Sequence, residues 1–127
     1  MNITVKAANH GVEKMLNNLK RFENNDGKIR SIMERYGQSG VEQLAEATPK
    51  KTGLTSESWT YTINKSKSGY ELVFNNTNVV DGANVAILIQ YGHGTGWGGY
   101  VQGTDYINPV IEPLFQSMVD EINKLYS

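Results

Sequence analysis

The chain has 127 residues, which suits one compact domain with a single hydrophobic core and leaves little room for a second. Hydrophobic residues make up 39% of the chain, and 12 basic against 13 acidic side chains give a formal net charge of -1. This composition excludes a disordered chain and disfavours a dedicated nucleic-acid-binding domain. The absence of cysteine excludes disulfide scaffolds, thiolate metal sites and cysteine nucleophiles.

The N-terminal part is predicted to form a short strand and then two helices. Ile3 and Val5 alternate with polar residues, and apolar residues at helical spacing predict a helix over about 10–23. After a turn, a second helical period runs from Ile29 to Pro49. Gly37 and Gly40 lie within this pattern, and each lowers helix stability by roughly 1 kcal/mol relative to alanine. We therefore expect a kink or a close crossing there, with a functional hinge as the alternative.

The pattern then changes to the two-residue period of strands. Apolar residues alternate with polar ones over 59–63 and again over 70–74, with a polar loop at 65–69 between them, which predicts an antiparallel hairpin. A polar connection over 75–84 follows. Residues 85–91 alternate again, and since both faces are largely apolar, we predict a strand that is central in its sheet or covered by a partner subunit.

The last third is predicted to be a long loop and a helix. Residues 92–108 show no period and hold six of the chain's 13 glycines, and Pro109 then begins a helical pattern that continues to Leu125. The predicted fold is therefore a single α+β domain over 1–127, in which a mainly antiparallel sheet of about four strands packs with two N-terminal helices and one C-terminal helix. The longest apolar run, Val85–Ile89, is far below the roughly 20 residues that cross a bilayer, so we expect no membrane partner.

The glycine-rich segment contains a match to a nucleotide-binding motif. Gly94–Gly99 reads G-x-G-x-x-G, but Tyr100–Gly103 follows it where that motif requires a helix. His93 could act as a base with Asp81 or Asp105, yet no spacing places these groups on one face. We expect no catalysis, no cofactor and no metal ligand, and keep a small nucleotide-binding or hydrolytic enzyme as the alternative.

Aromatic side chains on this segment favour a role in protein contacts. Glycine-rich segments lose entropy on ordering, which binding to a neighbour can offset, and aromatic residues are enriched at interface anchors. Trp97 either docks on another chain or folds back onto the sheet. We predict an interface with a second copy or a partner, formed by Val85, Ile87, Ile89, Tyr91, His93, Trp97, Tyr100 and Tyr106.

The segment after the second helix resembles a family signature. Thr48–Trp59 reads TPKKTGLTSESW, which is similar to the pattern T-P-x-x-T-G-x-L-x-x-S of head-tail junction proteins of tailed bacteriophages, also called neck or tail-completion proteins. Three further segments resemble this family in the same order, so that the resemblance covers nearly the whole chain: Gly11–Met15, Gln90–Thr95 and Ile107–Pro109. The chain departs from the family pattern at Leu54, which stands one place early, at Lys51, where an acidic residue is usual, and in its glycine content after Gly92.

The same signature has a physical interpretation as a structural turn. Pro49 biases the residue before it out of the helical region, Thr52 can bond to turn amides, and Gly53 allows the chain to reverse.

The resemblance implies a non-enzymatic virion protein that is made in the host cytoplasm and forms a ring, expected to be a hexamer, at the head-tail junction. Its partners would be copies of itself, the head-closure or portal proteins on one side, and the tail terminator or tail tube proteins on the other. A near-neutral chain suits a channel through which DNA slides non-specifically. A tail terminator that caps the tail tube is the alternative within the same class, and the net charge disfavours a DNA-binding accessory protein.

Overall fold

The computed structural model of the chain describes residues 4–6, 25–49, 53–66 and 69–126. The helix predicted over 10–23 and the predicted turn residue Thr52 lie outside these residues. The elements follow one another in this order: β1 (Thr4–Lys6), α2 (Asp26–Ala47), α3 (Gly53–Glu57), β2 (Trp59–Ser66), β3 (Gly69–Asn76), β4 (Val79–Val80), β5 (Ala83–Asn84), α4 (Val85–Tyr91), β6 (Gly92–Gly94), β7 (Tyr100–Gln102), α5 (Asn108–Asn123) and the 3-10 turn η3 (Lys124–Tyr126).

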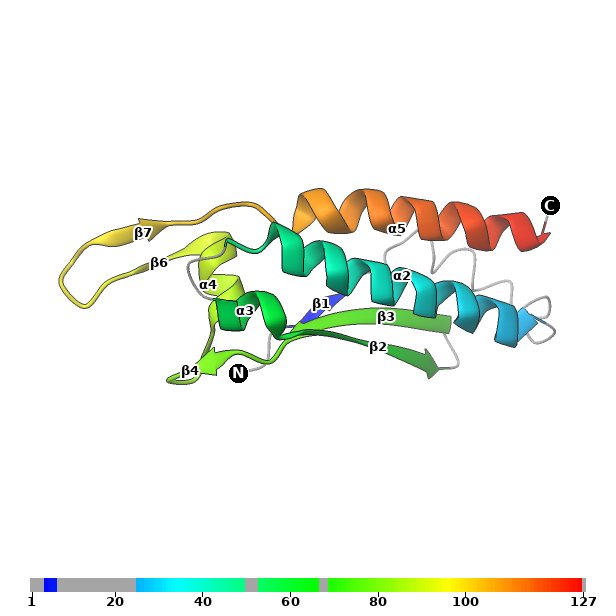
Figure 1. The fold of residues 1–127 in the computed structure, drawn as a ribbon, viewed down its shortest axis with the longest axis horizontal. Helices are drawn as coiled ribbons and strands as arrows, with labels where there is room; N and C mark the ends of the chain where they lie inside the picture. The colour runs from blue at the N-terminus through cyan, green and yellow to red at the C-terminus, as the bar shows by residue number, and fades with distance from the viewer. Residues whose placement is uncertain (1–3, 7–24, 50–52, 67–68, 127) are drawn as a thin grey trace.

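One helix covers a three-stranded sheet and a second helix lies alongside the first (Figure 1). The sheet has the order β1-β3-β2 and is antiparallel throughout, while α2 packs against β2, β3 and α5. The predicted α+β class is confirmed, as are the first strand, the second helix, the hairpin and the final helix. The predicted sheet of about four strands is wrong, because β4–β5 and β6–β7 form separate two-stranded sheets.

The hydrophobic core lies where α2, the sheet and α5 meet. Its fully buried side chains come from all three layers: Ile29, Met33, Leu44, Leu72, Phe74, Met118 and Ile122. At the surface of the same contact, the guanidinium of Arg35 on α2 pairs with the carboxylate of Glu121 on α5. Burial of these apolar side chains, at about 25 cal/mol per Å² of area removed from water, is the main source of stability.

Two glycines of α2 permit this close packing. A Cβ on Gly37 would lie less than 3.0 Å from the ring of Tyr61, and one on Gly40 would lie equally close to Phe74 and Leu114. Both glycines are buried inside a continuous helix. The expected close crossing is confirmed: α2 meets β2 at the first glycine, and β3 and α5 at the second.

The predicted strand over 85–91 is wrong, since these residues form the helix α4. Asn84 caps this helix: its side-chain oxygen accepts a hydrogen bond from the Ala86 amide at 3.1 Å, and its Nδ2 donates to the Asn76 carbonyl at 3.0 Å. Ala86 and Gln90, which are four residues apart, are its buried positions. Because apolar residues occupy nearly every position of this short run, a helix and a strand fit its pattern equally well.

The polar connection predicted over 75–84 contains a small hairpin. Asp81 and Gly82 join β4 to β5 with φ angles of 50° and 78°, the left-handed conformations that an Asp-Gly hairpin turn uses. Before this turn, Nδ2 of Asn76 donates to the Thr55 carbonyl and Nδ2 of Asn78 donates to the Thr55 hydroxyl, each at 2.8 Å. These buried bonds join the connection to α3.

The turn after α2 is fixed mainly by Thr48. This residue is extended, with φ -62° and ψ 126°, as expected before Pro49. Its hydroxyl donates to the Leu44 carbonyl at 2.6 Å and accepts from the Trp59 indole at 2.9 Å, which joins the end of α2 to the start of β2. Gly53 is the first residue of α3 and has no positive φ, so the prediction that its conformational freedom reverses the chain is wrong.

Candidate functional site

A hairpin projects from the body of the protein beyond α4 (Figure 1). Its strands β6 and β7 pair antiparallel, with His93 opposite Val101. Thr95 closes the tip, because its amide donates to the Gly99 carbonyl at 2.9 Å and its hydroxyl accepts from the Gly99 amide at 3.0 Å. The long loop predicted over 92–108 is therefore a β-hairpin followed by a short connection. Its glycines show no alternation of apolar and polar side chains, and the backbone hydrogen bonds between the two strands determine its structure.

Two glycines allow close contacts at the root of this hairpin. Gly92 has φ 80°, and a Cβ on it would lie less than 3.0 Å from the Val101 carbonyl on the opposite strand. A Cβ on Gly103 would lie 2.5 Å from the Gln90 carbonyl of α4. A larger residue at position 92 would therefore push the two strands apart and strain the backbone, and one at position 103 would push the hairpin away from the helix.

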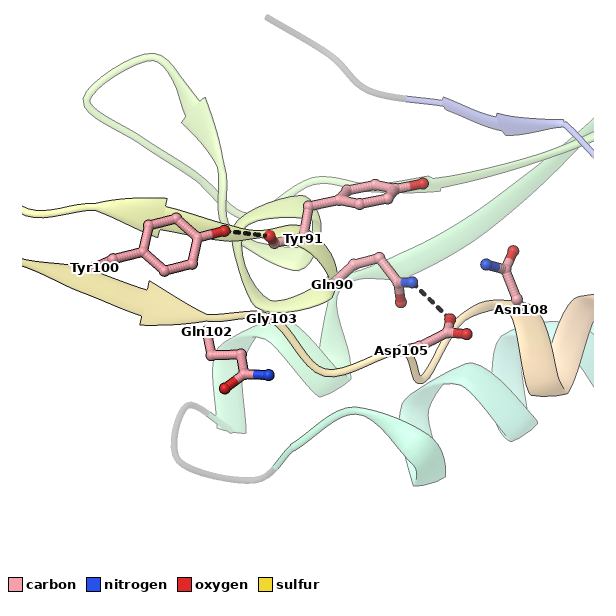
Figure 2. A pocket seen from close by; sticks show the side chains of 7 residues that line it. All are labelled: Gln90, Tyr91, Tyr100, Gln102, Gly103, Asp105 and Asn108. Carbon is pink, nitrogen blue, oxygen red and sulfur yellow. Dashed lines mark hydrogen bonds between the residues drawn. The ribbon is translucent and has the colours of Figure 1, made fainter.

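Hydrogen bonds then fix the direction in which the hairpin leaves the body. The Tyr100 hydroxyl donates to the Tyr91 carbonyl at 2.9 Å, as Figure 2 shows, and the Thr104 amide donates to the Ile89 carbonyl at 2.8 Å. Both bonds join the β7 side of the hairpin to the last turn of α4. The β6 side follows α4 directly in the chain, so the hairpin is held to the helix at its root.

Gln90 connects the hairpin to the final helix. Its Oε1 accepts from the amides of Tyr106 and Ile107, both at 3.0 Å, and its Nε2 donates to Asp105 at 2.6 Å (Figure 2). The side chain is buried, and the two amides lie directly before α5, where a helix leaves its amides without partners. One side chain of α4 therefore fixes the segment that links β7 to α5. The sequence analysis did not identify this role, and the isolated Gln in an apolar run was its only signal.

The residues predicted to form an interface differ in how far they are exposed. Tyr91, Trp97 and Tyr100 are exposed, with 66%, 98% and 67% of their surface accessible. Trp97 is at the tip of the hairpin and does not fold back onto the sheet. Val85, Ile89 and His93 are half-buried and surround a pocket, whereas Ile87 is half-buried against the core.

Tyr106 does not lie at the surface, and its predicted place in an interface is wrong. Only 5% of it is exposed, and its hydroxyl donates to the Ala86 carbonyl at 2.8 Å. Burial raises the pKa of this phenol above its ordinary value of 10.0. The carbonyl of α4 gives the hydroxyl a partner inside the core, which allows the aromatic ring to be buried.

Two pockets flank the root of the hairpin. The first, of about 630 Å³, has polar and apolar surface in about equal parts and is shown in Figure 2; its lining residues are Gln90, Tyr91, Tyr100, Gln102, Gly103, Asp105 and Asn108. The second, of about 350 Å³, is mostly apolar and lies between α4, the hairpin and the end of α2, with Pro49, Val85, Leu88, Ile89, His93, Val101, Gln102 and Thr104 around it.

The surface of the hairpin is uncharged. The sequence contains no Lys, Arg, Asp or Glu from Gly92 to Thr104. The two carboxylates considered as partners of His93 lie in different places: Asp81 is in the β4–β5 turn, and Asp105 accepts a hydrogen bond from Gln90. Within the described ranges, no three side chains of His, Asp or Glu are placed to hold a metal ion. No helix in the described part of the chain has the length and apolar content for a membrane span.

Comparisons with protein-family models, with curated protein sequences and with solved structures find no match to this chain. The functional proposal therefore depends on the geometry above and on the resemblance of its sequence motifs.

Proposed function

We propose that the chain is a structural component of a tailed bacteriophage, which assembles into a ring at the head-tail junction and uses the β6–β7 hairpin as a contact surface. Copies of the chain would form the ring, with head-closure or portal proteins on one side and tail proteins on the other. The motif order in the sequence supports the family, and the hairpin supplies the surface that assembly needs.

The observation that carries the proposal is the exposure of Trp97 at the tip of a well-fixed hairpin. Tryptophan is among the residues most enriched at interface anchors, and leaving it in water forfeits about 1.5–3 kcal/mol of favourable burial. Tyr91 and Tyr100 add two further exposed rings at the root. Coverage of the Trp97 side chain by another molecule would recover that free energy.

The charge distribution supports contact between proteins. The central part of an interface is depleted in charged residues, and the hairpin has none between Gly92 and Thr104. The net charge of -1 also gives the chain no overall attraction for DNA that passes through a ring. A ring requires two different faces on each subunit, so the hairpin would be one face and a separate part of the body the other.

A shortened hairpin tests this proposal. Replacing residues 94–100 with an Asn-Gly turn would close the pair of His93 and Val101 directly, because a two-residue turn of this type joins adjacent antiparallel strands. The core, α4 and the bonds of Gln90 are untouched, so we expect the variant to fold. The phage or prophage that encodes the chain is then complemented with the wild type, with the shortened variant or with Trp97→Ala.

The expected result is that the wild type restores infectious particles and both variants do not, although all three proteins accumulate. Electron microscopy of the failed assemblies identifies the role: full heads beside tails of normal length indicate a joining protein, whereas tails of irregular length indicate a terminator. Normal particle yield with the shortened hairpin would remove the hairpin from the proposed function.

A further inference from the structure

We propose that Trp97 of one copy inserts into the apolar pocket at the root of the hairpin of the next copy. This proposal rests on the proposed self-assembly of the chain and specifies its contact. It would make the interface heterologous, with the tip of the hairpin as one face and the pocket beside α4 as the other.

The pocket has the size and lining that an indole ring needs. Its volume of about 350 Å³ is at the lower end of the roughly 300–1,000 Å³ range of ligand pockets, which suits one bicyclic side chain. Val85, Leu88, Ile89 and Val101 supply its apolar walls, and no Lys, Arg, Asp or Glu lines it. The tip and the pocket can therefore meet without burying an unpaired carboxylate, ammonium or guanidinium group.

His93 supplies the one aromatic polar group in this wall. Its Nδ1 is buried and has no hydrogen-bond partner among the described residues, a state that native proteins rarely leave unexplained. The indole N–H of tryptophan is a donor that finds an acceptor when it is buried. The imidazole would gain this bond by turning towards a donor that enters the pocket.

The occupant must come from another molecule. Trp97 is at the tip of the hairpin and the pocket is at its root, and the paired strands with the closed turn at Thr95 hold the two apart. Figure 1 shows the hairpin extending away from the body of the protein. A side chain that fits a pocket elsewhere on an identical molecule generates a head-to-tail series of contacts. Such a series closes into a ring when its rotation permits.

The area available is consistent with a second copy as the partner. With about 150–250 Å² for each aromatic side chain, the exposed parts of Tyr91, Trp97 and Tyr100 amount to roughly 350–600 Å². A stable interface of standard size buries about 800 Å² on each partner. The three rings are divided between the two faces, with Trp97 on the tip face and Tyr91 and Tyr100 on the root face, and the remaining surface of the hairpin and of α4 would supply the rest.

Disulfide trapping tests the contact, because the chain has no cysteine of its own. Gly96→Cys places a thiol beside Trp97 at a position where an added Cβ meets nothing within 4 Å. Thr104→Cys places a thiol at the exposed rim of the pocket and leaves the backbone bond of residue 104 intact. Thr62→Cys, on an exposed position of β2, is the matched control.

We expect a mixture of the Gly96→Cys and Thr104→Cys proteins to oxidise to a mixed disulfide dimer, and a mixture of Gly96→Cys with Thr62→Cys to do so far less. Adding Trp97→Ala to the Gly96→Cys protein should reduce the mixed dimer, since loss of an interface anchor weakens association by about 30-fold or more. A protein with both Gly96→Cys and Thr104→Cys should form a ladder of species that ends in a closed ring without free thiols.

Three results would overturn the proposal: equal trapping by the Thr62→Cys control, trapping of Gly96→Cys mainly with itself, or no mixed dimer at any concentration. The first two would indicate random collision and tip-to-tip contact, respectively. Rings of the wild type by analytical ultracentrifugation without the mixed disulfide would reject this contact and leave the proposed function standing. The mixed disulfide together with normal particles from the shortened hairpin would reject the proposed function and leave the contact standing.

Discussion

Gln90→Leu should destabilise the protein by about 3 kcal/mol. The substitution keeps a buried side chain of roughly similar size but removes the acceptor of the Tyr106 and Ile107 amides. Each buried amide left without a partner lowers stability by about 1–3 kcal/mol. The added apolar contacts of leucine offset a part of the loss from the two amides. This is a large share of the roughly 5–15 kcal/mol by which domains are stable.

Urea unfolding measures this loss, and amide hydrogen exchange locates it. We expect the two amides before α5 to lose protection, because they are the groups that Gln90 holds. Gln116→Leu is the matched control: it removes only an exposed bond to Asp120 on the same helix, worth about 0.2–0.5 kcal/mol. A Gln90→Leu protein within about 0.5 kcal/mol of the wild type, with both amides still protected, would refute the assigned role of this side chain.

Other substitutions test the packing of the fold. Gly40→Ala should lower the free energy of unfolding in urea by about 1–3 kcal/mol, because the added Cβ meets the ring of Phe74. Gly27→Ala, which has open space around it, should raise that free energy by roughly 0.4–1 kcal/mol. Equal effects of the two substitutions would contradict the close crossing. Asn84→Ala should cost about 1 kcal/mol and expose the first amides of α4 to exchange, and unchanged exchange would exclude the cap. Burial raises the pKa of Tyr106 above the value of about 10 that the phenol has in the unfolded chain. Above about pH 10 the unfolded chain therefore releases this proton while the folded protein keeps it, and the stability that the neutral phenol contributes is lost as pH rises. Tyr106→Phe should therefore lose less stability than the wild type between about pH 8 and pH 11, and parallel losses would contradict the burial of the phenol.

The long periodic elements could be predicted from the sequence. The helical stripe from Ile29 onwards and the alternating pattern of the β2–β3 hairpin extend over enough residues for one period to dominate. Gly37 and Gly40 also indicated correctly that another element crosses α2 closely. In these segments the local pattern and the tertiary contacts favour the same structure.

The segment that carries the candidate site was harder to predict, because contacts distant in sequence decide its structure. Residues 85–91 contain three β-branched side chains, which favours a strand. Asn84 nevertheless caps a helix there: its side chain accepts from the Ala86 amide and also donates to the Asn76 carbonyl. Tyr106 reads as an exposed aromatic residue until the carbonyl of Ala86 is known to accept its hydroxyl. The hairpin after Gly92 gave no period because its glycines have no side chains to alternate.

The central claim is that the aromatic hairpin of this small domain binds a neighbouring protein surface. An electron microscopy map of the assembled particle, at a resolution that shows side chains, tests it most directly. The account predicts a ring in which each β6–β7 hairpin lies against an adjacent subunit, with Trp97 enclosed. Hairpins that extend freely into solvent, or a small molecule bound at their root in place of a protein, would contradict it.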